Sequence, residues 1–113
     1  MNSYVSGLFS EFLARNYLRL HGFRILKKRF KTGRFTGRAE IDIIAKKENL
    51  ILFVEVKKRP TITDAFNAIP RTQIKRLRTA AETFIEQRNW RGNARFDIII
   101  ITRFKIKWIK GAI

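Results

Sequence analysis

Two apolar runs decide the fold of this chain: Ala39-Glu40-Ile41-Asp42-Ile43-Ile44-Ala45 and, after a short turn, Leu50-Ile51-Leu52-Phe53-Val54-Glu55-Val56-Lys57. Apolar runs of this length on either side of a turn are typical of β-strands, so residues 39–46 and 50–57 are predicted to pair antiparallel through Lys47-Glu48-Asn49. Successive side chains of a strand alternate between its two faces. The second strand places Leu50, Leu52, Val54 and Val56 on one face, and Ile51, Phe53, Glu55 and Lys57 on the other. Both faces are largely apolar, so this strand is predicted to be covered on both sides.

Charged side chains interrupt both apolar strands. On the first strand, alternation groups Glu40 and Asp42 with Ile44, and it groups Ile41 and Ile43 with Ala45. If the two strands pair through the short turn, Asp42 lies close to Glu55. Burying a carboxylate or an ammonium is unfavourable unless the group is paired or binds an ion, so these charges mark a candidate site.

Two carboxylates and a lysine at one sheet edge suit phosphodiester hydrolysis. Asp42 and Glu55 would hold a divalent metal ion, which polarises a phosphate and lowers the pKa of an attacking water. The backbone carbonyl of Val56 would complete the coordination, and Lys57 would orient the water or stabilise the developing negative charge. The alternative is an ordinary Glu-X-Lys ion pair on a surface strand, which contributes little.

Composition limits the kind of metal and the kind of partner. The chain has 113 residues with no cysteine and one histidine, so a metal site here must rest mainly on carboxylates, which favours Mg²⁺ or Mn²⁺. The 25 Lys and Arg against 9 Asp and Glu give a net charge of +16, which favours a polyanion such as nucleic acid over an anionic membrane surface. No apolar run could span a membrane and no signal peptide is recognisable, so a cytoplasmic location is expected.

The remaining pattern predicts one α/β domain over residues 1–113, a mixed β-sheet flanked by helices in the order α-β-β-β-α-β-β. A first helix over residues 4–20 has an apolar stripe of Val5, Leu8, Phe9, Phe12, Leu13 and Leu20, and a second over residues 72–88 has one of Ile74, Leu77, Ala81, Phe84 and Ile85. Further strands are predicted at residues 23–30, 96–102 and 106–109. Asp97 is expected to pair with a nearby arginine, His21 to end the first helix, and both tryptophans to pack.

Basic residues cluster in a Gly-containing segment and around the candidate site. The segment 27–38 is predicted to be a pliable arm that binds phosphate, the alternative being a solvated hairpin tip. The predicted nucleic-acid-binding residues are Lys27, Lys28, Arg29, Lys31, Arg34 and Arg38 of the arm, Lys58 and Arg59 after the second strand, and Gln73, Lys75 and Arg76 of the second helix. For Gln73, a solvated helix position is the alternative.

The Asp-X(n)-Glu-X-Lys arrangement resembles that of the PD-(D/E)XK nuclease superfamily, which includes restriction endonucleases and Holliday junction resolvases. The whole chain is similar to the YraN family of uncharacterised predicted endonucleases, through residues 7–14, 17–18, 22–26, 39–45, 53–59, 80–81, 96–97 and 109–112. The resemblance implies a restriction-endonuclease-like core, with Asp42 and Glu55 as metal ligands and Lys57 as catalytic lysine. It adds Glu11 as a fourth member of the site, the third that is acidic, the alternative being an exposed helix carboxylate. The family usually has Gly at the position of Ala39.

Three functions remain open from the sequence. The first is a Mg²⁺-dependent endonuclease that hydrolyses DNA, with branched or damaged DNA as candidate substrates; a homodimer would suit such cutting by analogy with the resolvases. The second is a non-catalytic nucleic-acid-binding module on a nuclease-like fold. The third is a basic protein associated with RNA or ribosomes, which would leave the paired carboxylates unexplained.

Overall fold

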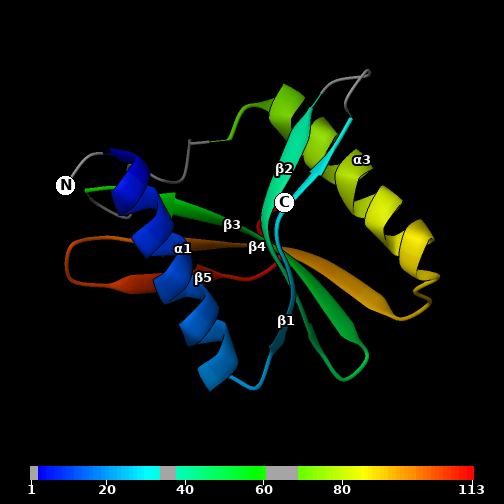
Figure 1. Ribbon diagram of the computed structural model, residues 1–113, viewed down its shortest axis with the longest axis horizontal. Coiled ribbons are helices and arrows are strands. Elements are labelled where there is room, and N and C mark those ends of the chain that lie inside the picture. The colour runs from blue at the N-terminus through cyan, green and yellow to red at the C-terminus, as the bar shows by residue number, and fades with distance from the viewer. Residues whose placement is uncertain (1–2, 34–37, 61–68) are drawn as a thin grey trace.

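A computed structural model describes residues 3–33, 38–60 and 69–113 and shows a five-stranded sheet with a helix on each face (Figure 1). The elements are α1 (Ser3–Leu20), β1 (Arg24–Thr32), β2 (Ala39–Lys47), β3 (Leu50–Lys58), α3 (Arg71–Arg88), β4 (Asn93–Ile101) and β5 (Ile106–Ile109). The predicted order of helices and strands is therefore confirmed. In the parts of the chain just named, no helix has the length and apolarity needed to cross a membrane.

The strands lie in the sheet in sequence order, β1-β2-β3-β4-β5. Neighbours pair antiparallel except β3 and β4, which pair parallel with Phe53 opposite Phe96. A parallel pair needs a crossover connection rather than a hairpin, and α3 lies in that connection. The predicted mixed sheet is thus confirmed, and β3 is bonded on both sides.

Both faces of β3 are covered, as its two apolar faces predict. Leu52 and Val54 pack under α1 with Ala14 and Leu18, whereas Ile51 and Phe53 pack under α3 in a second cluster that includes Leu77, Phe84 and Ile44. All of these side chains are at most 3% exposed. Full burial of one such Leu, Ile or Phe contributes about 1.5–3 kcal/mol, so the two clusters hold the end of β3 that carries the charges in a defined place.

The prediction that Ile41 shares a face with Ile43 is wrong. Ile43 packs in the cluster under α1, but Ile41 packs in the cluster under α3. The regular pairing of β2 with β3 runs from Lys47 only to Ile43, beyond which β2 stays paired with β1 alone. On the facing strand, Arg29 has a left-handed backbone with φ 51. The alternation of faces therefore breaks at Asp42, between Ile41 and Ile43.

The apolar stripe predicted for α1 is also largely wrong. Leu8, Phe9, Phe12 and Leu20 are 38%, 53%, 49% and 84% exposed. Leu13 of the predicted stripe packs against the cluster under α1, and the side chain of Val5 lies outside the described part of the helix. Among the side chains of residues 7–20, the buried ones are Ser10, Glu11, Ala14 and Leu18. Small side chains let the helix approach the sheet closely, and Glu11 is drawn inward by an ion pair described below, so size and charge outweigh hydrophobicity in choosing this face.

Helix α3 follows its predicted stripe, with Leu77, Ala81 and Phe84 buried together with Ala80. It begins after Pro70, whose φ of −64 and ψ of 154 place it just outside the helix, and it ends before Asn89 in a left-handed conformation. The strand predicted over residues 23–30 is confirmed as β1 and extends to Thr32, so the first half of the predicted arm is a strand. Arg34 lies outside the described residues.

Candidate active site

Asp42 and Glu55 lie beside each other where β2 and β3 separate, as the predicted pairing required. Oδ2 of Asp42 accepts a hydrogen bond of 2.8 Å from the amide of Val56 on β3. The amide of Asp42 on β2 donates one of 3.4 Å to Oε1 of Glu55. Each carboxylate therefore bonds to the backbone of the opposite strand, one step beyond the last regular pair, Ile43 with Val54.

Burial sets the protonation of this pair. Glu55 is 3% exposed, and burial together with the negative charge of Asp42 raises its pKa to about 8. Burial also raises the pKa of Asp42 to about 6, although the Val56 amide opposes that rise. The raised pKa values of these two adjacent carboxyl groups mean that the fold stabilises their negative charges poorly. A cation bound between them would therefore be favoured.

Lys57 is the third predicted member, and the structure brings it to the same place. Alternation along β3 puts it on the face of Glu55, and it is half-buried. Its positive charge lowers the pKa values of both Asp42 and Glu55, though by less than burial raises them. The three side chains of the predicted trio are therefore within electrostatic reach of one another.

The trio lines a cleft of about 540 Å³ between the sheet and the start of α3. Gln73 and Arg76 of α3 line the cleft opposite Asp42, Glu55 and Lys57. Gln73 is half-buried, so it is not the fully solvated helix residue of the alternative reading. Lys75 is exposed on the same helix and does not line the cleft.

Glu11, the member that the resemblance adds, lies on α1 and is not among the residues that line the cleft. Its side chain is 10% exposed and pairs with Arg29, with Nη2 of Arg29 at 2.6 Å and Nε at 3.2 Å from Oε2. Its negative charge contributes to the raised pKa of Asp42, so the two carboxylates lie near each other. The alternative of an exposed helix carboxylate is wrong.

Arg29 has a position that nothing in the sequence indicated. Besides pairing with Glu11, its Nε lies 3.9 Å from Oε1 of Glu40, so the guanidinium, predicted to bind phosphate, is engaged by carboxylates of the protein. A left-handed φ at a non-glycine strand residue has no clear sequence signal. Glu40 lines the cleft together with Asp42, although the alternation that groups them in the sequence breaks at Asp42.

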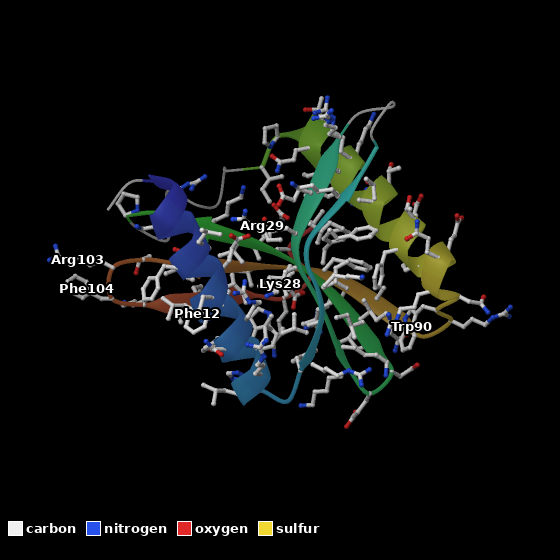
Figure 2. All side chains as sticks on the ribbon, in the orientation of Figure 1. Phe12, Lys28, Arg29, Trp90, Arg103 and Phe104 are labelled. Carbon is white, nitrogen blue, oxygen red and sulfur yellow. The ribbon has the colours of Figure 1, made fainter. Side chains whose placement is uncertain are left out.

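The other predicted nucleic-acid-binding residues gather around the cleft and along β1. Arg38 lines the cleft and, with Lys31, an adjoining hollow of about 720 Å³. Lys27 and Lys28 line a further hollow of about 360 Å³ between β1 and α3, which Arg88 also lines. Figure 2 shows Lys28 and Arg29 next to each other near the centre of the view. Lys58 is exposed at the end of β3, and Arg59 after it donates a hydrogen bond of 2.7 Å to the Lys58 carbonyl.

The donor set suits a hard divalent ion. Asp42 and Glu55 supply carboxylate oxygens, and the carbonyl of Val56 leaves β3 on the same side as its amide, which faces Asp42. Among the described residues, no three His, Asp or Glu side chains converge closely enough to enclose a metal by themselves. Mg²⁺ retains several waters and binds through one or two carboxylates plus phosphate, so a site with two carboxylates fits it.

Asp97 belongs to a separate, structural network. It is fully buried and accepts hydrogen bonds from Arg95, from Nε1 of Trp108 at 2.7 Å and from the amide of Gly111 at 2.8 Å. The predicted pairing of Asp97 with an arginine is confirmed. His21 follows the end of α1, also as predicted, with Nδ1 2.8 Å from the Tyr17 carbonyl oxygen.

Comparison with known proteins shows which family this chain resembles. The uncharacterised protein family UPF0102 matches residues 10–101 of the chain. A UPF0102 protein of Bartonella bacilliformis is 41% identical over 106 residues, which cover 92% of this chain and 84% of that protein. Another, of Paramagnetospirillum magneticum, is 35% identical over 88% of this chain and 79% of its own length. A third, of Shewanella sediminis, is 38% identical over 94% and 89%.

Proposed function

The chain belongs to the uncharacterised protein family UPF0102, and we propose that it is a metal-dependent endonuclease that hydrolyses phosphodiester bonds in DNA. The observation that carries the proposal is the contact between Asp42 and Glu55, two carboxylates anchored on each other's strands beside Lys57. The sequence resemblance to the PD-(D/E)XK nucleases supports the same chemistry. Replacing buried ionic groups by apolar residues of similar volume is often neutral or stabilising, so stability alone does not account for carboxylates at this place.

In this proposal Asp42, Glu55 and the Val56 carbonyl hold Mg²⁺ or Mn²⁺. The bound ion would polarise the phosphate and lower the pKa of a water molecule. The ammonium of Lys57 would stabilise the negative charge that develops on the phosphate oxygens. Arg76 and Arg38 line the same cleft and would bind the flanking phosphates, while Gln73 would donate or accept a hydrogen bond there.

The charge of the chain supports DNA as the substrate. The net charge of +16 attracts any polyanion, and basic side chains line the cleft and both neighbouring hollows. Branched or damaged DNA, a homodimer and a cytoplasmic location remain part of the proposal. Since a cleft open at the sheet edge can receive a bent or interrupted duplex, the first substrates to compare are junctions, flaps and nicks.

A second candidate is a nucleic-acid-binding module without catalysis. The observation in its favour is that Arg29 already neutralises Glu11 and Glu40, which leaves two carboxylates for a metal among the described residues. The basic residues around the cleft would then bind DNA without cutting it.

Cleavage of labelled linear, nicked, flapped and junction DNA with Mn²⁺ tests the proposal. We expect the wild type and Glu86→Gln to cut at least one substrate, and Glu55→Gln to cut none. Glu86 is an exposed carboxylate of α3, so its variant is matched in chemistry and charge. Binding without cutting by all three proteins would contradict the nuclease and support the binding module.

A further inference from the structure

Three exposed phenylalanines, two on α1 and one in the loop between β4 and β5, have no role in the proposed cleft. Phe9 and Phe12 of α1 are 53% and 49% exposed, and Phe104 in the loop between β4 and β5 is 84% exposed. Figure 2 shows Phe12 on the outside of α1 and Phe104 projecting at the left edge of the molecule. Single exposed apolar residues are common, but here two of the three have an arginine as a neighbour.

Two of the three rings have an arginine beside them. The guanidinium of Arg15 lies 6.0 Å from the centroid of the Phe12 ring, and that of Arg103 lies 5.3 Å from the centroid of Phe104. A guanidinium over a ring leaves the other face of the ring open while adding positive charge next to it. Ring and cation together are the combination that binds the bases and the backbone of an unpaired strand.

The loop that carries Phe104 is held in place. The amide of Thr102 donates a hydrogen bond of 2.9 Å to the Lys105 carbonyl, and the amide of Lys105 donates one of 3.0 Å to Oγ1 of Thr102. The adjoining strand β5 packs Ile106 and Trp108 against the cluster under α1. The tip therefore adjoins a strand whose side chains pack under α1, and the ring of Phe104 is presented to solvent by a closed turn.

The charge of this side argues for a polyanion rather than for a second copy of the chain. The sole carboxylate of α1 is Glu11, which points inward and is paired with Arg29. On the same helix Arg19 is exposed and Arg15 is half-buried, and the loop carries the exposed Arg103 and Lys105. Two copies would bring these positive charges together, whereas a nucleic acid strand would neutralise them.

The rings and the cleft lie on different faces of the sheet. The cleft lies between the sheet and α3, whereas Phe9 and Phe12 belong to α1, which covers the other face. A helix is about 10–12 Å across with its side chains, so a strand on the outer face of α1 is separated from the cleft by at least that distance. The same nucleic acid molecule would therefore have to pass around the end of the sheet to occupy both places.

We propose that Phe9, Phe12 and Phe104, with Arg15 and Arg103, form a surface that binds unpaired nucleotides by stacking on their bases. This surface deepens the proposed function, because it specifies that the substrate has a single-stranded segment. It depends on that function only for the choice of DNA. Binding to it requires neither Asp42 nor a metal ion.

The test is binding of a labelled 20-nucleotide oligo(dT) in EDTA, compared with a duplex of the same length and with oligo(rU). Replacing both Phe12 and Phe104 by Leu keeps apolar area but removes the rings. We expect this double variant to lose on the order of 25-fold in affinity for the single strand, about fivefold or more for each ring, and less than twofold for the duplex. Equal binding of oligo(rU) would assign the surface to unpaired nucleotides of either sugar.

Matched variants separate stacking from other effects. Leu20→Ala removes an apolar side chain that is 84% exposed on the same helix and should leave binding unchanged. Replacing Phe12 and Phe104 by Tyr should retain binding, because the rings remain. Arg15→Gln and Arg103→Gln should each reduce, by about 0.7, the steepness with which the logarithm of the binding constant falls with the logarithm of the salt concentration. The Phe variants should leave this steepness unchanged.

Two results would overturn the inference. One is an equal loss of single-strand and duplex binding, or no loss at all, in the double Leu variant. The other is a shift of that variant from dimer to monomer in sedimentation with single-strand affinity unchanged, which would assign the rings to contact between copies. EDTA prevents cleavage, so failure of the nuclease proposal would not affect either result.

Discussion

The amide of Val56 donates a hydrogen bond to the carboxylate of Asp42, while the amide of Asp42 donates one to the carboxylate of Glu55. Where the backbone pairing of β2 and β3 ends, a carboxylate on each strand therefore accepts a hydrogen bond from a backbone amide of the other strand. Backbone amides orient both carboxylates before any ligand arrives. A site of this kind needs no rearrangement of the strands to bind a cation.

The stability of the metal-free protein should fall as pH rises. Glu55 has a pKa of about 8 in the folded chain against an ordinary value of 4.5, so the folded state holds a proton that the unfolded state has lost. The free energy of unfolding is therefore expected to decrease between about pH 5 and pH 8 and to level off above that range. Thermal unfolding in EDTA across this range measures it. In Glu55→Gln the decrease should be much smaller, and an unchanged pH dependence would contradict the assignment.

Metal binding at pH 7 should release a proton. Below a pKa of about 8 the carboxyl of Glu55 is largely protonated, and a metal ligand must be ionised. Calorimetry with Mn²⁺ in buffers of different ionisation enthalpy should therefore show the release of roughly one proton per ion. Release should be lost in Glu55→Gln, and equal heats in all buffers for the wild type would contradict the prediction.

Replacing Lys57 by Met should lower kcat far more than it raises KM. In the proposed mechanism its charge would act on the phosphate as negative charge develops, and loss of one such group lowers kcat by about 10²–10³-fold. The same variant should raise the pKa of Glu55 further, since Lys57 now lowers it. Lys75→Met, an exposed lysine of α3, is the matched control. Equal losses in the two variants would remove Lys57 from the site.

Arg29 and Glu11 should be energetically coupled. The guanidinium lies between Glu11 and Glu40, so Arg29→Gln leaves a nearly buried Glu11 without its closest partner. We expect Arg29→Gln to reduce the free energy of unfolding by about 1–2 kcal/mol, and the double variant with Glu11→Gln to lose less than the sum of the two. Urea unfolding of the four proteins gives the coupling, and strict additivity would exclude it.

Asp97→Ala should be among the most destabilising single changes. Asp97 is fully buried and accepts bonds from Arg95, Trp108 and Gly111, which would lose their acceptor. The expected loss is about 3–5 kcal/mol, measured by urea unfolding. Cleavage per folded molecule should be unchanged, because Asp97 lies outside the cleft. A loss of cleavage without a loss of stability would reverse that assignment.

The strand pair and its carboxylates could be predicted from the sequence because their signals are local. Two apolar runs joined by a short turn determine their own pairing, and that pairing alone brings Asp42 to Glu55. The two apolar faces of β3 likewise indicate cover on both sides. The rest of the order followed from helical spacing and from β-branched runs.

The exposed face of α1 and the place of Arg29 could not be predicted in this way. Hydrophobic spacing favours Leu8 and Phe12 for burial, but close packing selects Ala14, and the ion pair selects Glu11. Such choices depend on partners distant in the chain. The change of face at Ile41 could not be predicted either, because it occurs where β2 stops pairing with β3, and the sequence does not mark that point.

The parallel pairing of β3 with β4 has a consequence for the order of folding. Strands β1, β2 and β3 pair through neighbours in the chain, so little entropy is lost in joining them. Strand β4 joins β3 only after the intervening chain with α3 has returned across the sheet, which is slower. During synthesis, therefore, the meander that carries Asp42 and Glu55 is expected to form first and to expose one edge of β3 until β4 covers it. That open edge is where a nascent chain would be most prone to aggregate.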